Sequence, residues 1–265
     1  MNLAYKKVYF TILAVLALAT MPGPARAADP DPRNDGPRSL IITYHTTPAN
    51  RGALRAYMQN TGLKDFAQWK QQGAMQDYHV YFNRYVDSDN WDMLALVTLA
   101  PGNGTERWKH IEAGHPAGLS QSALGLTTSI NTAPGDLVRS NATHAKGVAD
   151  KPPVFLMVPY DYVVSLGEYL KYVDAYVVPQ MEGWMQEGVL SRYSVYLSRY
   201  PAGRPWSAFL VYEYANEEAL GQRDRVLAKV RARLADNPEW KAVSESKHNV
   251  RKEEQPVVAD ELVAN

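Results

Sequence analysis

Apolar and polar residues alternate along two stretches of this chain, and the alternation predicts β-strands. In residues 78–85, Tyr78 and Val80 fall on one face of the expected strand, and His79 and Tyr81 fall on the other. A short polar segment that is typical of a turn then leads into a second, more apolar strand. The two strands should pair as a hairpin.

The same pattern returns in the second half of the chain, and apolar residues at helical spacing precede each hairpin. The helices are expected over about 50–72 and 166–187, and the hairpins over 78–99 and 192–214. Gly73 and Gly188 should end the helices, because glycine readily adopts the left-handed conformation of a C-terminal cap. Gly62 should weaken the first helix, and Pro179 should kink or restart the second.

These patterns belong to a repeat without gaps, in which residues 69–100 match residues 184–215 at a constant offset of 115 positions. Identical residues in register include Trp69/Trp184, Gly73/Gly188, Tyr78/Tyr193, Val80/Val195, Tyr81/Tyr196, Arg84/Arg199, Tyr85/Tyr200 and Trp91/Trp206. A long unit that occurs only twice indicates two similar domains, since a solenoid needs three or more short units.

The remaining elements complete the same order in both halves. They are strands over about 40–46, 137–142, 154–160 and 249–258, a short helix capped by Thr105, and a long helix over 217–235. Each half therefore reads β-α-β-β-α-β, the ferredoxin-like order. The predicted fold class is α+β, with tandem ferredoxin-like domains at 38–148 and 152–258 and a tail at 259–265. Because this fold covers only one sheet face with helices, the two sheets should pack together as a pseudo-dimeric α+β barrel within one chain.

The first residues have the features of an export signal. Lys6 and Lys7 precede an apolar stretch that is too short to span a bilayer, and Ala25-Arg26-Ala27 has the small-x-small pattern of a signal peptidase site. We expect cleavage after Ala27, a disordered proline-rich leader over 28–37, and a periplasmic or secreted mature protein without a membrane span. An uncleaved anchor is the alternative.

Charge and residue content argue against several classes of function. The chain has 28 basic and 28 acidic residues, and its signal contains basic residues but no acidic ones, so the mature protein is weakly acidic. Such a balance gives no electrostatic footprint for nucleic acid. The chain has no cysteine, hence no disulfide, and none of its six histidines has a metal-ligand spacing such as His-x-x-x-His. No metal site is expected.

The order of elements and the repeated pattern Trp-x-x-x-Gly…Tyr-x-Val-Tyr-x-x-Arg-Tyr…Trp resemble the dimeric α+β barrel superfamily over nearly the whole mature chain. That superfamily includes quinone-forming antibiotic monooxygenases, EthD-like and NIPSNAP-like proteins, haem-degrading enzymes and chlorite dismutases. The resemblance is closest to uncharacterised exported members. It implies a cavity between the sheets. No cofactor is expected, but the resemblance keeps haem as an alternative, with His110 or His248 as the axial ligand.

Strand alternation predicts which side chains face that cavity. The helices should cover the apolar face of each hairpin, so the aromatic and polar face should point between the sheets. The candidate ligand-binding residues are His79, Tyr81, Asn83 and Tyr85 in the first half and Tyr196, Ser198 and Tyr200 in the second. Their hydroxyl, amide and imidazole groups suit a flat aromatic or quinone-like molecule. The alternative is that they simply fill the interface between the sheets.

The repeated tryptophans and arginines have structural explanations as well. Trp69/Trp184 and Trp91/Trp206 are expected in the core. Arg84 and Arg199 could bind a ligand carboxylate bidentately, but duplication favours a structural role, because an active site rarely needs both copies.

Two classes of function stay open. The first is an exported protein that binds a small aromatic or apolar molecule between the sheets. The second is a cofactor-independent monooxygenase-like enzyme, in which His79 or a barrel tyrosine transfers a proton. A structural pairing module is the third alternative. No Gly-x-Ser-x-Gly sequence, phosphate-binding loop or dinucleotide fingerprint points to another chemistry.

Overall fold

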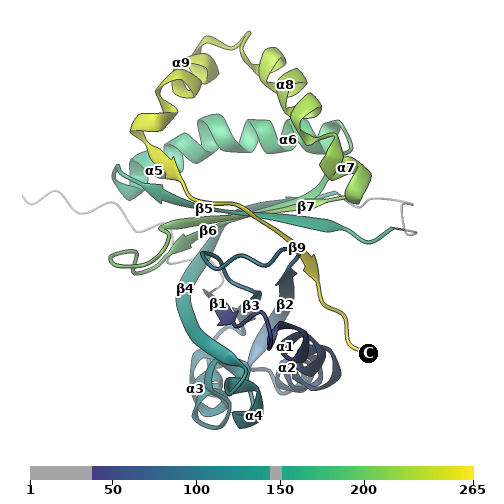
Figure 1. The fold of residues 1–265 in the computed structure, drawn as a ribbon. Helices are drawn as coiled ribbons and strands as arrows, with labels where there is room; N and C mark the ends of the chain where they lie inside the picture. Colours follow the sequence, from purple (N-terminus) through teal and green to yellow (C-terminus); the bar gives the residue numbers. More distant parts are fainter. Residues whose placement is uncertain (1–37, 144–150) are drawn as a thin grey trace, which may run out of the picture. The chain divides into compact units, whose positions relative to one another are not determined.

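A computed structural model describes residues 38–143 and 151–265 (Figure 1). The predicted signal peptide, the leader and the end of the first domain at 144–148 lie outside the described residues. No helix in the part of the chain that is described combines the length and apolar character needed to cross a membrane.

The two halves contain matching elements. The first half consists of β1 (Arg38–Thr46), α1 (Arg51–Tyr57), a π-helical turn (Met58–Gly62), α2 (Leu63–Gln71), β2 (Met75–Asn83), β3 (Met93–Leu99), α3 (Gly104–Gly114), a 3-10 turn (Pro116–Gly118), α4 (Gln121–Leu124) and β4 (Thr127–Ala142). The second consists of β5 (Val154–Tyr162), α5 (Leu166–Tyr172), a π-helical turn (Val173–Val177), α6 (Val178–Gln186), β6 (Leu190–Ser198), β7 (Ala208–Tyr214), α7 (Glu217–Gly221), α8 (Arg223–Leu234), α9 (Pro238–Ser246), a 3-10 turn (Lys247–Asn249), β8 (Arg251–Glu253) and β9 (Val257–Glu261).

The offset of 115 positions holds from the start of α1 to the end of β3, so it begins well before the repeat found over residues 69–100. Both predicted helix interruptions take the same form, a π-helical turn that falls at equivalent positions in the two halves. Gly73 and Gly188 follow the helices with φ of +74° and +76°, as expected for glycine caps.

All strand pairs are antiparallel, and the strands close into a barrel. Their order is β7-β6-β4-β1-β3-β2-β9-β5, and β5 pairs with β7 to complete eight strands. The short β8 pairs with β5 as a ninth strand. The four strands of the first half and the four of the second meet along two seams, β4 with β6 and β2 with β9.

Several elements differ from the sequence expectation, and tertiary pairing explains two of them, β4 and β9. Strand β4 has 16 residues instead of the short strand expected, because its first part pairs with β1 and its last part with β6. Strand β9 extends beyond the expected domain end, because residues 259–261 pair with β2. Helix α9 was not expected, and α3 begins at Gly104 after Asn103 rather than after a Thr105 cap.

Buried side chains form a helix-facing core in each half and a third core inside the barrel. In Figure 1 the helices of each half cover the outer face of that half's strands. Val80 and Phe82 belong to the helix-facing core of the first half, and Tyr81 belongs to the barrel interior, so the predicted alternation of β2 is confirmed. Tyr196 likewise lies in the interior.

The helix-facing core of the second half contains a run of neighbouring aromatic rings that accounts for α9. The rings are Tyr162, Tyr169, Tyr172, Tyr176 and Trp240, with centroids 4.6 to 5.9 Å apart in succession. Trp240 of α9 ends the run and donates its indole N–H to the carbonyl oxygen of Tyr176 at 3.2 Å. This packing holds α9 in place.

The repeated arginines form equivalent ion pairs at the two seams. Arg84, just after β2, donates from Nε and Nη2 to Asp260 of β9 at 2.9 and 2.7 Å. Arg199, just after β6, donates from Nε and Nη2 to Asp136 of β4 at 3.1 and 2.5 Å. Each arginine therefore ties its own hairpin to the last strand of the other half. The geometry therefore supports a structural role for both Arg84 and Arg199.

The two pairs should differ in energy, because Asp136 is fully buried whereas the side chain of Asp260 is 40% exposed. We expect Arg199→Met to lower the free energy of unfolding by about 3–5 kcal/mol, since it leaves a buried carboxylate without its partner. Arg84→Met should cost about 1 kcal/mol. Urea denaturation of both variants measures the difference.

The double variant Arg199→Met/Asp136→Leu serves as the control, because removing both charges should recover most of the loss. Equal losses in the two single variants would contradict this account of the seams.

Candidate functional site

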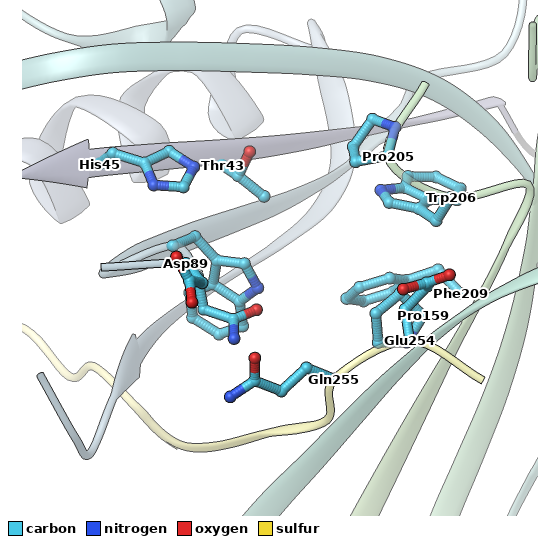
Figure 2. A pocket seen from close by; sticks show the side chains of 11 residues that line it. Thr43, His45, Asp89, Pro159, Pro205, Trp206, Phe209, Glu254 and Gln255 are labelled. Carbon is cyan, nitrogen blue, oxygen red and sulfur yellow. The ribbon is translucent and has the colours of Figure 1, made fainter. Parts of the chain in front are cut away.

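A cavity of about 360 Å³ lies at one end of the barrel, and both halves line it (Figure 2). Its lining residues are Thr43, His45, Asp89, Asn90 and Trp91 from the first half and Pro159, Pro205, Trp206, Phe209, Glu254 and Gln255 from the second. Figure 2 shows Thr43 and His45 across the cavity from Pro205 and Trp206. The volume is within the range of small-molecule sites, roughly 300–1,000 Å³.

The apolar wall of the cavity is aromatic. Trp91 and Trp206 occupy equivalent positions, just before β3 and just before β7, and both line the cavity. They are 7% and 4% exposed and belong to the barrel interior, as does Phe209, whose ring centroid is 5.3 Å from that of Trp206. The core assignment of the repeated tryptophan is confirmed. The sequence patterns did not predict that these tryptophans line a cavity. The available signal was an identical residue beside the hairpin loop in both halves.

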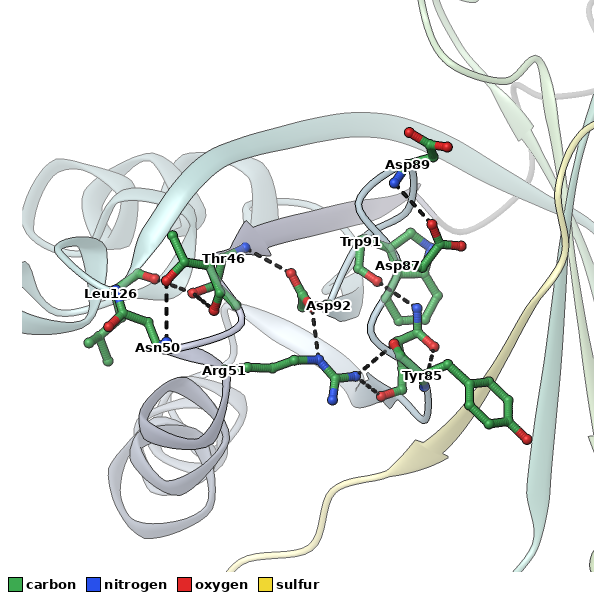
Figure 3. A network of polar contacts seen from close by, with 11 residues as sticks. Thr46, Asn50, Arg51, Tyr85, Asp87, Asp89, Trp91, Asp92 and Leu126 are labelled. Atoms are coloured by element: carbon green, nitrogen blue, oxygen red, sulfur yellow. Dashed lines mark hydrogen bonds and ion pairs between the residues drawn. The ribbon is translucent and has the colours of Figure 1, made fainter.

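The loop between β2 and β3 carries three of the lining residues, and a polar network fixes it (Figure 3). Asp92 accepts a hydrogen bond from Arg51 Nε at 2.8 Å and from the backbone N–H of Thr46 at 2.8 Å. Arg51 also donates to the carbonyl oxygens of Asn83 and Tyr85. The network ties the loop to the end of β1 and to the start of α1, so Trp91 is held at the cavity.

Asn83 belongs to this network and does not face the cavity. It is 3% exposed, and its amide donates to the carbonyl oxygen of Trp91 at 3.0 Å and accepts from the N–H of Tyr85 at 3.0 Å. In the second half, Ser198 and Ser207 stand at the positions of Asn83 and Asp92, and both are buried.

The other residues proposed from strand alternation lie in different surroundings. Tyr81 and Tyr196 are buried in the barrel interior, where burial raises the pKa of Tyr196 to about 12. Tyr85 and Tyr200 follow the ends of β2 and β6 and are each 65% exposed. The structure stacks His79 on Tyr81, with ring centroids 6.0 Å apart, and places Tyr81 and Tyr196 in one cluster, but it does not bring the other members to them. None of the set lines the cavity. Their role in ligand binding stays a prediction.

His79 lies further along β2, in a group of charged side chains. Its Nδ1 is 2.6 Å from Glu261 Oε1 and its Nε2 is 3.4 Å from Asp77 Oδ2. Burial by itself lowers the pKa of His79, and Arg192 lowers it further, but the two carboxylates outweigh both effects, so the pKa is raised. Glu261 belongs to β9 and His79 to β2, so this contact also spans a seam of the barrel.

The histidines proposed as haem ligands lie outside the barrel. His248 is exposed in the turn after α9, and His110 is exposed on α3. His110 borders a surface hollow of about 430 Å³ together with Trp69, Gln72, Ala74, Arg107, Ile111 and His115. Neither imidazole is enclosed as an axial ligand would be, so these residues do not fit a haem in the barrel cavity. Within 38–143 and 151–265, no three His, Cys, Asp or Glu side chains are grouped as a metal site would require.

Comparison with known proteins identifies the fold. No protein-family model and no curated protein matches the chain. A candidate monooxygenase of Lactobacillus acidophilus is 15% identical, with 86% of this chain and 94% of that chain covered and a TM-score of 0.52. A candidate monooxygenase of Fusobacterium nucleatum is 9% identical, with 86% and 93% covered and a TM-score of 0.52.

A dye-decolorizing peroxidase of Bacteroides thetaiotaomicron is also 9% identical, with 86% of this chain and 93% of that chain covered and a TM-score of 0.51. At such identities the similarity shows the fold alone. The fold that the chain shares with these structures is an α+β fold with an antiparallel eight-stranded barrel.

The His79 contact predicts a pH-dependent contribution to stability. Because the folded-state pKa is raised, the stabilisation is fully present below the unfolded pKa of about 6.5 and is lost as the pH rises through the folded value. His79→Gln should therefore lower the urea midpoint more at pH 6 than at pH 9. His248→Gln, at an exposed histidine, should change the midpoint little at either pH. A pH-independent loss in His79→Gln would refute the ion pair.

Proposed function

We propose that this protein binds a small aromatic or apolar molecule in the cavity at the end of its barrel. The observation that carries the proposal is the cavity wall formed by Trp91, Trp206 and Phe209. Large aromatic side chains offer flat apolar surface to a ligand, and a few polar groups at the rim can orient it. The site therefore has the composition of a small-molecule site, and it adjoins the buried cluster of side chains inside the barrel.

In the same proposal, the two halves are tandem ferredoxin-like domains that arose by duplication. The strand orders β4-β1-β3-β2 and β9-β5-β7-β6 support this, because each corresponds to the ferredoxin-like order 4-1-3-2. In a chain with two such domains, both sides of the cavity come from the same polypeptide. We further propose that the protein is exported, on the basis of Lys6, Lys7 and Ala25-Arg26-Ala27.

A second candidate function is oxygenation of the bound molecule. Two of the structures with this fold are named as candidate monooxygenases, and His45 lines the cavity. In such a reaction, an imidazole removes the proton of a bound phenol, and the phenol and O₂ then give a quinone and water. His45 replaces His79 as the base in this alternative, because His79 is hydrogen-bonded to Glu261 and does not line the cavity.

Oxygen uptake separates the two candidates. The purified protein is mixed with a panel of phenols in an oxygen-electrode cell, and quinone formation is followed by absorbance. Uptake that falls at least tenfold in His45→Gln, with ligand binding retained, would favour the enzyme. Binding without uptake would favour the binding protein.

The binding proposal predicts a loss of affinity when the aromatic wall is reduced. We expect Trp206→Phe to weaken binding of 1-naphthol roughly threefold to tenfold, measured by isothermal titration calorimetry, because part of the stacking surface is removed. Trp184→Phe is the matched control. Trp184 is the same residue type, is 7% exposed, and belongs to the helix-facing core of the second half instead of the cavity.

The control should lose stability to a similar degree but keep its affinity for 1-naphthol. If both variants bind as tightly as the wild type, or if the wild type binds no aromatic probe, the cavity is not a binding site.

A further inference from the structure

The rim of the barrel cavity has an unusual balance of polar groups. Asp89 and Glu254 supply carboxylates, whereas no lysine or arginine among the described residues lines the cavity. Glu254 accepts a hydrogen bond from Lys252 Nζ at 2.6 Å, so its charge is already paired. The carboxylate of Asp89 is exposed and has no ion-pair or hydrogen-bond partner within the described residues.

The two amides of the rim are oriented by a further carboxylate, that of Asp87. Asn90 and Gln255 each direct a side-chain nitrogen to Asp87 Oδ2, both at 2.9 Å. An ionised carboxylate only accepts hydrogen bonds, so the NH₂ group of each amide must face Asp87. The amide oxygens are then left for other donors. In Figure 2 the Gln255 oxygen points toward the other lining side chains.

The cavity therefore presents hydrogen-bond acceptors and negative charge above an aromatic wall. A second cavity of about 380 Å³ shares His45 and Asn90 with it and adds Asp87 and Asp92 to the lining. Asp92 is paired with Arg51 at 2.8 Å, and the described part of the chain places no lysine or arginine in this second cavity either. Hydrogen-bond acceptors and carboxylates thus line the neighbouring cavity as well.

Aromatic faces strengthen the same preference. The faces of Trp and Phe carry negative partial charge and attract cations, with Trp the strongest of the aromatic residues. An anion in this cavity would meet Asp89, two amide oxygens and the faces of two tryptophans. A cation would find favourable contacts with all of them.

From these observations we propose that the barrel cavity selects organic cations, with a flat aromatic body against Trp91 and Trp206 and the positive charge toward Asp89. This inference rests on the proposed binding function and adds the charge of the ligand to it. Aromatic amines, quinolinium-type rings and small quaternary ammonium compounds belong to this class.

Three flat probes of similar size test the inference by isothermal titration calorimetry: N-methylquinolinium, 1-naphthol and naphthalene-1-sulfonate. We expect the wild-type protein to bind the cation at least tenfold more tightly than the sulfonate, with the neutral probe in between. Added salt should weaken the binding of the cation and leave the affinity for 1-naphthol unchanged. Asp89→Asn should reduce the affinity for the cation roughly threefold to tenfold more than it reduces the affinity for 1-naphthol.

Asp236→Asn is the matched control, because Asp236 is exposed in the segment between α8 and α9 and does not line the cavity. Equal affinities for cation and sulfonate, or an Asp89→Asn variant that binds the cation as tightly as the wild type, would overturn the inference and leave the binding function standing. Failure of all three probes to bind would overturn the binding function itself.

Discussion

Closure of the barrel is the constraint on which the other features of this structure depend. Each half would expose two strand edges, and exposed edges are open to unwanted pairing. Here β4 of the first half pairs with β6, and β9 of the second half pairs with β2, so all four edges are used within one chain. Arg199 and Arg84 secure these seams by equivalent ion pairs with Asp136 and Asp260. The second half thus supplies the strand edges with which the first half pairs.

The pseudo-symmetry of the two halves also explains the cavity. Equivalent residues meet at one end of the barrel, where Trp91 and Trp206 both line the cavity. Further along the barrel the equivalent positions have diverged: Asp77 corresponds to Arg192, and His79 to Ser194. Arg192 lies close enough to His79 to lower its pKa. The two halves therefore carry opposite charges at one pair of equivalent positions, Asp77 and Arg192, and identical tryptophans at another.

The two halves also hold the cavity loops in different ways. Asp92 and Arg51 fix the loop before β3 through an ion pair, whereas Ser207 makes only neutral hydrogen bonds to the backbone near the end of β5. Asp89, the rim carboxylate without an ion pair among the described residues, lies on the loop that Arg51 and Asp92 hold. In the proposed complex with an organic cation, a loop that is already fixed would spare the entropic cost of ordering it on binding.

Local sequence patterns determined the elements and their faces, because helix and strand periods depend on near neighbours. The repeat, the glycine caps after α2 and α6 and the inward position of Tyr81 could all be predicted. The length of β4 and the partner of β9 could not, since both depend on pairing between residues far apart in the chain. The candidate site was missed for the same reason. Strand alternation assigns a side chain to a face, but only the closed barrel decides which end is filled by side chains and which end is left open.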